Sequence, residues 1–296
     1  MRADFQGWVT TRQAHFESVL HELLPRAEAA PQRLHAAMRY SVLNGGKRVR
    51  PLLAFAAGEL TGADAARVNV AAAAVELIHA YSLVHDDMPC MDDDVLRRGK
   101  PTCHVEYDEA TALLAGDSLL TLAFQLLAEQ RLNDDAARQL EMIRLLAVAA
   151  GSRGMAGGQA IDLASVGKTL TLPELEYMHI HKTGALIRAA ILLGARCGSV
   201  TAAQLDMLDR FGKLVGLAFQ VVDDVLDCEA DTATLGKTAG KDADNDKPTY
   251  VSLLGIQGAR DMAQQLHREA LESLSGFGDA AQRLRELADF IVLRKF

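Results

Sequence analysis

Aromatic residues are scarce in this sequence. Phe, Trp and Tyr together account for 5% of the 296 residues, whereas hydrophobic residues of all kinds account for 49%. Most of that apolar content is Ala and Leu. Ala and Leu lose little free energy on entering a helix, while aromatic and β-branched residues favour strands. The composition therefore indicates a helical protein.

Cysteine is also scarce, and its spacing does not suit metal binding. No two cysteines form a C-x-x-C pair, which argues against a zinc site or a disulfide framework. Free thiols in a reducing compartment are the simpler interpretation. The cysteines are Cys90, Cys103, Cys197 and Cys228.

Long apolar runs are missing as well. The N-terminal stretch MRADFQGWVTTRQAHFES carries charges throughout and contains no signal-peptide core. No stretch approaches the roughly 20 uninterrupted apolar residues of a membrane span. We therefore expect a soluble, cytoplasmic protein without membrane insertion.

Positive charge is in short supply. The chain has 31 Lys and Arg against 39 Asp and Glu, which gives a formal net charge of −8. Because phosphate backbones favour a basic face, a nucleic-acid partner is not expected. An acidic chain that binds phosphorylated molecules must gather its cations locally or recruit metal ions.

Apolar residues recur at spacings of three and four along most of the chain, which predicts helices. Several of the predicted helices are apolar on nearly all sides and should lie inside a bundle. No repeat, linker or alternating strand pattern divides the sequence. We therefore predict an all-α fold with a single domain, 1–296, built as a large helical bundle. The clearest helical segments are 68–85, 111–130, 136–153, 186–197 and 202–226.

Three polar breaks interrupt the helical pattern. Residues 44–51 form a basic turn, residues 92–104 a charged loop, and residues 227–249 the longest polar stretch. Loops of that last length in a compact domain are usually functional or disordered.

Carboxylates gather where the helical segment 68–85 ends, from Asp86 to Asp94. An isolated acidic run is most often a solvated helix end. Here the aspartates would face the negative end of a helix dipole, and they repel one another unless a cation lies among them. Pro89 disfavours helix at Met88, so the chain can bend and bring Asp92 back towards Asp86.

A second acidic group lies inside another apolar segment. Asp223 and Asp227 are one turn apart on the same helix face, next to Asp224. Buried carboxylates without partners are unfavourable, and cations would compensate them. Oxygen-only sites suit magnesium, which is usually shared with a substrate phosphate. Two such groups on separate apolar helices predict a magnesium–diphosphate site.

A second phosphorylated substrate would need its own anion site. Lys47 and Arg50 flank a glycine-containing turn, and Arg97 and Arg98 follow the first aspartate group closely. Taken singly, each is more often an exposed surface charge. Their position beside the acidic groups favours a role in binding.

Two other polar features interrupt apolar helices. His79 lies two helical turns before Asp86, on nearly the same face. A lone histidine in an apolar helix is usually a core residue, but this one lies along the line of the aspartates. Lys182 and Thr183 interrupt a further helical pattern, where a polar pair can face the same cavity.

Four glycines cluster between two helical segments. No strand precedes them, so a nucleotide-binding loop is not expected and close helix packing is the better interpretation. They are Gly151, Gly154, Gly157 and Gly158.

Taken together, these motifs make the chain resemble the trans-isoprenyl diphosphate synthases, and within them the bacterial farnesyl diphosphate synthases. The matching stretches span positions 45 to 250 in the order found in that family. They are GGKRVRP (45–51), HAYSLVHDDMPCMDDD (79–94), LRRGKPTCH (96–104), GGQAIDL (157–163), HKTGALI (181–187), FQVVDDVLD (219–227), TATLGKTAGKD (232–242) and KPTY (247–250).

The resemblance implies an all-α isoprenoid synthase fold, a helical bundle around a central cavity that is usually homodimeric. It places Mg²⁺ on Asp86, Asp92 and Asp223. It implies isopentenyl diphosphate binding by Lys47, Arg50, His79 and Arg98. It implies allylic diphosphate binding by Arg97, Lys182, Thr183, Gln220, Lys237 and Lys247. One departure is Val95, where related sequences often carry another Asp; it follows Asp92 and should not affect metal binding.

The implied reaction is head-to-tail condensation of isopentenyl diphosphate with dimethylallyl and geranyl diphosphate to give farnesyl diphosphate. A bulky aromatic at the position of Tyr81 closes the cavity floor in that family. Tyr81 lies about 7.5 Å along the helix from Asp86 but points about 140° away from it, whereas Ser82 lies nearer the aspartate face. Tyr81 would therefore reach the growing chain from the side, unless it is simply a packing residue.

Three alternatives remain open. A geranylgeranyl diphosphate synthase would share the fold and stop at a longer product. A class I terpene cyclase would lack the second aspartate motif and the site for a second diphosphate. A non-catalytic partner subunit would have lost aspartates from one motif, whereas none is missing here.

Overall fold

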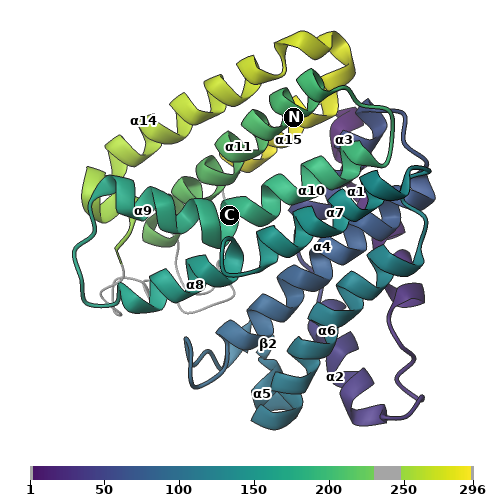
Figure 1. Ribbon diagram of the computed structural model, residues 1–296. Coiled ribbons are helices and arrows are strands. Elements are labelled where there is room, and N and C mark those ends of the chain that lie inside the picture. Colours follow the sequence, from purple (N-terminus) through teal and green to yellow (C-terminus); the bar gives the residue numbers. More distant parts are fainter. Residues whose placement is uncertain (1–2, 230–247, 295–296) are drawn as a thin grey trace.

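The structure is a computed structural model that describes residues 3–229 and 248–294, and within them it consists almost entirely of helices (Figure 1). The predicted all-α fold is confirmed. The α-helices are α1 (Ala3–Leu23), α2 (Gln32–Val42), α3 (Val49–Leu60), α4 (Ala65–Asp86), α5 (Cys103–Glu106), α6 (Glu109–Glu129), α7 (Ala136–Ala150), α8 (Met155–Ala164), α9 (Leu172–His179), α10 (Ala185–Arg196), α11 (Ala202–Glu229), α14 (Tyr250–Ser273) and α15 (Gln282–Val292).

Helix α4 runs through the middle of the bundle and carries the first aspartate motif at its end. Its N-terminus is capped by Asp64, whose carboxylate accepts a hydrogen bond of 2.7 Å from the backbone N–H of Ala66. The stretch Ala71–Ala74 is fully buried, because small side chains let neighbouring helices approach on several sides. The expected segment 68–85 therefore is part of a core helix, and the packing of this helix fixes the position of Asp86 at its C-terminal end.

Two of the three predicted polar breaks, residues 44–51 and 92–104, contain regular structure that was not expected there. Helix α3 already begins at Val49, so Arg50 and Pro51 belong to its first turn, where proline is tolerated because its missing N–H needs no partner. Residues 92–104 contain a hairpin that the apolar pattern did not predict. In it β1 (Leu96–Arg97) pairs antiparallel with β2 (Lys100–Pro101) around Arg98 and Gly99, both with positive φ.

The third break begins later than predicted, because α11 continues to Glu229. Helix α14 then begins at Tyr250, where the side chain of Thr249 accepts a hydrogen bond from the N–H of Ser252. Lys237 and Lys247, both expected near the allylic diphosphate, lie outside the described residues.

Among the described residues, the core consists of three clusters of buried side chains, which are linked by partly buried residues that pack against two of them. Trp8 and Leu145 pack against both the first and the second cluster. Leu214 and Val292 pack against both the second and the third. In Figure 1, α14 lies along α11 at the top of the molecule, while α2, α5 and α6 lie at the bottom.

Two described helices, α4 and α6, have the length and mean hydropathy of a membrane span, which the sequence-based expectation did not foresee. In α4, 72% of the apolar window is buried inside the protein, as in the core helix of a globular domain. In α6 the buried share is only 39%, so this helix presents apolar side chains to the outside.

Candidate active site

The first aspartate motif folds back on itself directly after α4. The backbone N–H of Asp92 donates a hydrogen bond of 2.8 Å to the carbonyl oxygen of Asp86, and the N–H of Asp93 donates one of 3.2 Å to Met88. This is the bend that Pro89 predicted. It brings Asp92 close enough to Asp86 for the two carboxylates to repel each other.

The Asp86 carboxylate is set between polar partners from other helices. Gln159 of α8 donates a hydrogen bond of 2.9 Å to its Oδ1. Burial raises the pKa of Asp86, and Lys182 and Gln159 only partly oppose that shift. A carboxylate that burial pushes towards protonation, next to a second carboxylate, suits a cation, and the all-oxygen donors suit Mg²⁺.

Asp87 has a different role from its neighbour. Its carboxylate accepts hydrogen bonds from the guanidinium of Arg97. The Nε atom lies 2.9 Å from Oδ1 and 2.8 Å from Oδ2, and a terminal nitrogen lies 2.5 Å from Oδ1. Asp87 is buried, so this fork-shaped ion pair satisfies a carboxylate that water does not reach. Arg97, predicted near the allylic diphosphate, thus lies beside the motif and fixes the hairpin to it.

Lys182 lies in a π-helical turn, η1 (Ile180–Gly184), which explains the interrupted helical pattern. Its ammonium group donates a hydrogen bond of 2.5 Å to Asp162 of α8. Burial alone would lower the pKa of Lys182, but Asp162, Asp86 and Asp92 together raise it. The residue therefore carries a positive charge that faces the first aspartate motif.

Gly158 allows this close approach of α8 to η1. A Cβ atom on Gly158 would lie 2.1 Å from the backbone nitrogen of Lys182, a distance that real side chains do not adopt. The packing interpretation of this glycine is confirmed.

Thr183 and Gln220, also predicted at the allylic site, contact each other. The Thr183 hydroxyl donates a hydrogen bond of 3.0 Å to Oε1 of Gln220, whose amide donates one of 2.9 Å to Asp224. Asp224 also accepts a hydrogen bond of 2.8 Å from the backbone N–H of Tyr250. This chain of contacts fixes η1, α11 and the start of α14 to one another.

The four residues expected to bind isopentenyl diphosphate line one cavity of about 510 Å³. Asp223 lies in the same wall. The Nε atom of Arg50 is buried there and has no hydrogen-bond partner among the described residues, so a cationic donor remains available for an anion. The lining residues are Asn44, Gly46, Lys47, Arg48, Val49, Arg50, Glu76, His79, Arg98, Phe219, Asp223 and Arg294.

His79 contributes to this cavity as a neutral side chain. Burial and the positive charges of Arg50 and Arg98 hold the pKa of His79 well below its ordinary value. The imidazole can therefore accept or donate a single hydrogen bond without adding a charge. It lies on α4 with Asp86, as the spacing predicted.

Arg294, near the C-terminus, was not predicted to belong to the site. It donates a hydrogen bond of 2.6 Å to Asp223 and one of 3.1 Å to the carbonyl oxygen of Phe219. Its guanidinium carbon lies 4.1 Å from the centre of the Phe219 ring. No local pattern in the sequence marks this arginine, because only the fold brings α15 to α11.

Gln159 and Asp162 were also missed as individual residues. Both belong to the stretch GGQAIDL, and they are three positions apart on α8. That spacing puts them on one helix face, which could have suggested a common target.

Tyr81 and Ser82 are both buried on α4. The Tyr81 ring packs edge to face against His85, with ring centres 5.6 Å apart, and His85 in turn lies against α6. The Ser82 hydroxyl donates a hydrogen bond of 2.8 Å to the backbone of His79. Tyr81 thus lies to the side of the aspartates, as helix geometry predicted.

Among the described residues, no three carboxylate, histidine or cysteine side chains come together as a ready-made metal cage. Asp86 and Asp92 lie on the Lys182 side, whereas Asp223 lies in the basic cavity. Such an arrangement suits ions that take many of their ligands from substrate phosphates and water.

Relatives of known name match this chain over most of its length. It is 47% identical to "Farnesyl diphosphate synthase" of Haemophilus influenzae over 96% of this chain and 93% of the relative. It is 50% identical to "Farnesyl diphosphate synthase" of Escherichia coli over 87% and 88% of the two chains. It is also 45% identical to "Geranylgeranyl pyrophosphate synthase, chloroplastic" of Capsicum annuum, over 98% and 79%.

Solved structures of similar proteins also match this chain over nearly its full length. An FPP/GFPP synthase from Zymomonas mobilis superposes with a TM-score of 0.89 at 40% identity, covering 99% of this chain and 100% of that one. A geranyltransferase from Helicobacter pylori, complexed with magnesium and isoprenyl diphosphate, gives 0.84 at 34% identity, covering 99% and 98%. The polyprenyl synthetase family model matches residues 31–287. The chain therefore belongs to the polyprenyl synthetase family and is a prenyltransferase.

Proposed function

We propose that the protein condenses isopentenyl diphosphate head to tail with dimethylallyl diphosphate and then with geranyl diphosphate, and releases farnesyl diphosphate. The observation that carries this proposal is the pair of separate anion sites. One combines the Asp86–Asp92 turn with Lys182, and the other is the basic cavity around Arg50. Two diphosphate-bearing substrates need two such sites.

The first site is suited to ionise an allylic diphosphate. Asp86 and Asp92, together with Asp223 across the cavity, are the proposed ligands of Mg²⁺, which when bound withdraws charge from the leaving diphosphate. Lys182, held by Asp162, adds a fixed positive charge on the same side. The C–O bond breaks, the diphosphate keeps the electron pair, and an allylic carbocation remains.

The second site is suited to hold the nucleophile. Lys47, Arg50, neutral His79 and Arg98 bind the diphosphate of isopentenyl diphosphate, so that its double bond can attack the carbocation. A new carbon–carbon bond forms, and one proton leaves for the released diphosphate. Thr183 and Gln220, fixed by their mutual hydrogen bond, offer oxygen dipoles that steady the cation.

The direct test is to incubate the purified protein and Mg²⁺ with labelled isopentenyl diphosphate and each allylic primer in turn. The products are dephosphorylated and sized by chromatography. We expect fifteen-carbon farnesol from both the dimethylallyl and the geranyl primer. Absence of any incorporated label would contradict the proposal.

A geranylgeranyl synthase is the nearest alternative, since several matched relatives carry that name. The buried Tyr81 beside the end of α4 favours the shorter product. A terpene cyclase takes a single diphosphate and has no use for the basic cavity. A non-catalytic subunit has no use for an intact set of aspartates.

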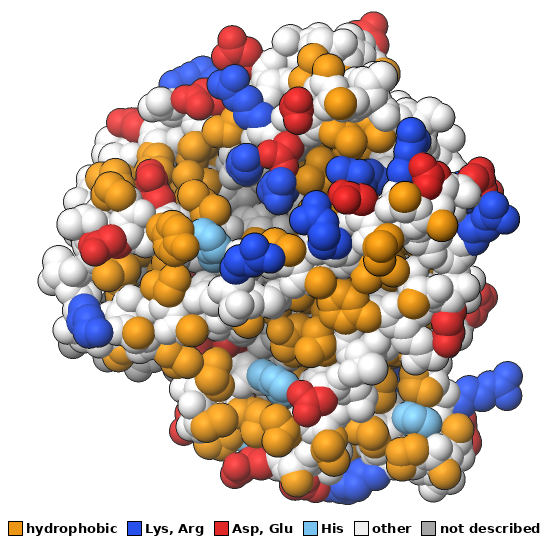
Figure 2. Space-filling model, in the orientation of Figure 1, with side chains coloured by type: hydrophobic (Ala, Val, Ile, Leu, Met, Phe, Trp, Pro, Cys, Tyr) orange, Lys and Arg blue, Asp and Glu red, His pale blue; other side chains and the backbone are white. Residues whose placement is uncertain are grey.

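We also propose that the protein is a single-domain, cytoplasmic homodimer without membrane insertion. The partly buried residues that pack against two core clusters at once support one domain. The outward apolar side chains of the α5–α7 region support a second copy as the cover of this surface. Figure 2 shows hydrophobic side chains gathered on the face where α6 and α7 lie. The exposed ones are Val105, Leu113, Leu114 and Leu140.

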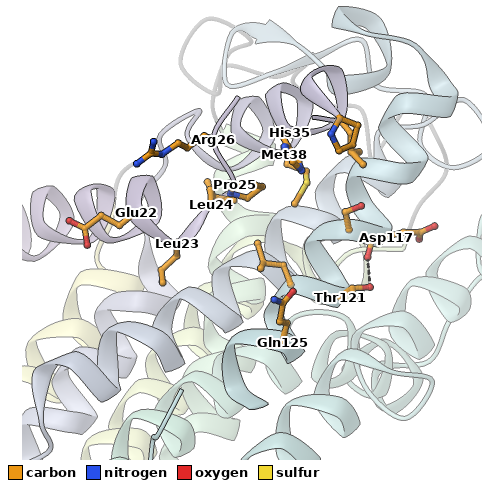
Figure 3. A pocket seen from close by; sticks show the side chains of 14 residues that line it. Glu22, Leu23, Leu24, Pro25, Arg26, His35, Met38, Asp117, Thr121 and Gln125 are labelled. Carbon is orange, nitrogen blue, oxygen red and sulfur yellow. Dashed lines mark hydrogen bonds between the residues drawn. The ribbon is translucent and has the colours of Figure 1, made fainter. Parts of the chain in front are cut away.

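A cavity of about 680 Å³ lies on the same side of the molecule, between the end of α1, α2 and α6 (Figure 3). Asp117, Thr121 and Gln125 form its α6 wall, and it contains none of the predicted site residues. Because these α6 residues are exposed, a second copy that covers α6 would also close this cavity.

Light scattering after size exclusion tests the dimer. We expect twice the chain mass for the unaltered protein and a shift towards one chain mass for Leu114→Arg. Leu293→Arg is the matched control, because Leu293 is also exposed but lies beyond α15. A single chain mass for the unaltered protein would contradict the homodimer.

A further inference from the structure

Arg48 lies in the wall of the basic cavity, but its charge is turned inward. Its Nε donates a hydrogen bond of 2.8 Å to Glu17. One terminal nitrogen donates a hydrogen bond of 2.7 Å to Glu76, and the other donates one of 2.7 Å to the carbonyl oxygen of Val42. All three guanidinium nitrogens are thus engaged by the protein, and only 2% of the side chain is exposed. Arg48 is therefore not a substrate-binding arginine like its neighbours.

The backbone at Arg48 adopts a left-handed conformation, with φ 51° and ψ 37°. Gly45 and Gly46 before it also have positive φ, at 72° and 132°. Such a conformation is unfavourable for a residue with a Cβ atom and persists only where the surroundings hold it. The hydrogen bonds of the Arg48 side chain to Glu17, Glu76 and Val42 stabilise this backbone conformation.

The turn at Arg48 sets the positions of the two cations that flank it. Lys47 precedes it, and Arg50 follows in the first turn of α3. A rotation of the backbone at Arg48 would move both of these residues relative to the cavity. Arg98, the third cation, donates a hydrogen bond to Gly45 and so depends on the same turn.

Glu76 is the buried anchor of this arrangement. It lies on α4, is 3% exposed, and stands one turn before His79, on the cavity side. Burial lowers the pKa of Arg50, and the negative charge of Glu76 is the foremost influence that opposes this shift. The negative charge of Glu76 thus offsets part of the repulsion among the cations of this cavity.

A buried ion pair is rarely kept for stability alone. Two well-packed apolar residues of similar size often hold a core equally well or better. The retained charges at Arg48 and Glu76 therefore need a reason other than packing, and the cation-lined cavity beside them provides one.

We propose that Glu76 and Arg48 are a positioning pair for the isopentenyl diphosphate site, which fixes the turn from Gly45 to Arg48 and so aims Lys47 and Arg50 into the cavity. This inference rests on the proposed function. Neither residue contacts the reacting atoms, and the pair acts through its neighbours.

The test is Glu76→Gln, which keeps the shape of the side chain but removes its charge. We expect the KM for isopentenyl diphosphate to rise roughly ten-fold, the effect of one charge-assisted contact, with the KM for geranyl diphosphate unchanged. The matched control is Glu286→Gln on α15, since Glu286 is also buried and pairs with Arg283 at 2.8 Å. We expect this control to leave both KM values unchanged.

A second variant covers the case in which Glu76→Gln fails to fold. In Arg48→Met/Glu76→Leu, both charges are replaced by apolar groups, so no uncompensated charge is buried. We expect this protein to fold, as judged by circular dichroism, and still to show the raised KM for isopentenyl diphosphate alone. An unchanged KM in it, or an equal rise of both KM values in either variant, would overturn the positioning role.

The proposed function can fail separately from this inference. If the unaltered protein does not incorporate isopentenyl diphosphate, the proposed function is wrong, and the inference falls with it. If the unaltered protein is active and Glu76→Gln has the same KM for isopentenyl diphosphate, only the positioning role is wrong.

Discussion

Arg294 and Asp223 form an ion pair of 2.6 Å that joins the C-terminal end of the chain to the second aspartate motif. The arginine is 5% exposed, whereas the aspartate is 45% exposed on the cavity side. A proposed magnesium ligand thus has a cationic partner within the chain itself. Any ion that binds Asp223 has to compete with Arg294 or share the carboxylate with it.

Arg294→Met should therefore strengthen metal binding to the substrate-free protein. Because Asp223 is partly exposed, the pair contributes about 1 kcal/mol at most, so we expect an increase in affinity of up to about five-fold. Calorimetric titration with Mn²⁺ measures this without any turnover. Arg283→Met is the control, since Arg283 pairs at 2.7 Å with Asp4 outside the cavity. Unchanged or weaker metal binding in Arg294→Met would show that the pair does not compete.

Asp86→Ala should abolish most turnover and leave the fold intact. The substitution removes a proposed magnesium ligand, and preorganised electrostatic stabilisation is usually the largest catalytic contribution, on the order of a hundred-fold or more. Circular dichroism should still show a helical protein, because Asp86 is the last residue of α4 and its replacement removes one side-chain hydrogen bond, from Gln159. Near-normal rates at saturating magnesium would refute the metal assignment.

Asp87→Ala provides the contrast to that experiment. Asp87 is buried and held by Arg97, so its loss leaves an unpaired guanidinium and should lower the melting temperature. The two neighbouring aspartates are thus expected to differ. Asp86→Ala should mainly lower turnover, whereas Asp87→Ala should mainly lower the melting temperature.

Lys47→Ala and Arg50→Ala should raise the KM for isopentenyl diphosphate more than the KM for the allylic substrate. Both side chains line the basic cavity, and a charge-assisted contact contributes roughly 1.5–3 kcal/mol, which is about ten- to a hundred-fold. Steady-state kinetics with each substrate varied in turn measures the two constants. If the allylic constant moves instead, the two diphosphate sites are exchanged.

Local sequence predicted much of the fold and part of the site. The bend at Pro89 and the core helix α4 follow from local chemistry, and a packing role for Gly158 follows from the lack of a strand before it. The structure shows each of them, although the partner of Gly158, Lys182, was not predicted. The hairpin at Arg98 was missed because strands of two residues are too short to give an alternating pattern. The first turn of α3 was missed because a proline and two cations resemble a loop.

The partners of the site residues were harder to predict, since they depend on which helices meet. Asp162 holds Lys182 across two helices, and Arg294 reaches Asp223 from the far end of the chain. Periodicity reports which face of a helix is apolar, but not which distant helix covers it. The roles of Gln159, Asp162, Glu76 and Arg294 therefore emerged only from the packed structure.

His179 should make stability depend on pH. It is buried against Tyr250, both ring nitrogens lack partners among the described residues, and burial lowers the pKa of His179 to about 3. The folded protein thus keeps it neutral while the unfolded chain protonates it below its ordinary pKa of 6.5. Stability linked to His179 is fully present above pH 6.5 and is lost progressively as the pH falls towards 3.

Urea unfolding at pH 7.0 and pH 5.0 tests this linkage. One proton contributes about 1.4 kcal/mol per pH unit, so the native protein should lose about 2 kcal/mol more than His179→Phe between these two values. The phenylalanine variant keeps a ring against Tyr250 but cannot take up a proton. Equal losses in the two proteins would show that His179 does not carry the linkage.

Tyr81→Ala should lengthen the product. The ring is 8% exposed, packs against His85 with ring centres 5.6 Å apart, and lies at the contact between α4 and α6, one turn below the first aspartate motif. A prenyl chain that grows away from Asp86 along α4 would meet this level after about 7.5 Å. Removing the ring opens space there without touching the aspartates, so the overall rate should stay within a few-fold while products shift towards twenty carbons or longer.

Chromatographic sizing of the dephosphorylated products measures this shift. Tyr107→Ala is the control, because Tyr107 also packs edge to face against an aromatic ring, Tyr40, at 5.7 Å, but lies between α5 and α6 and not on α4. If Tyr81→Ala still stops cleanly at fifteen carbons, Tyr81 is a packing residue and another side chain sets the length. If Tyr107→Ala lengthens the product as well, the limit reflects the general rigidity of the α4–α6 region, because a loss of packing at a different ring pair then has the same effect as opening the floor.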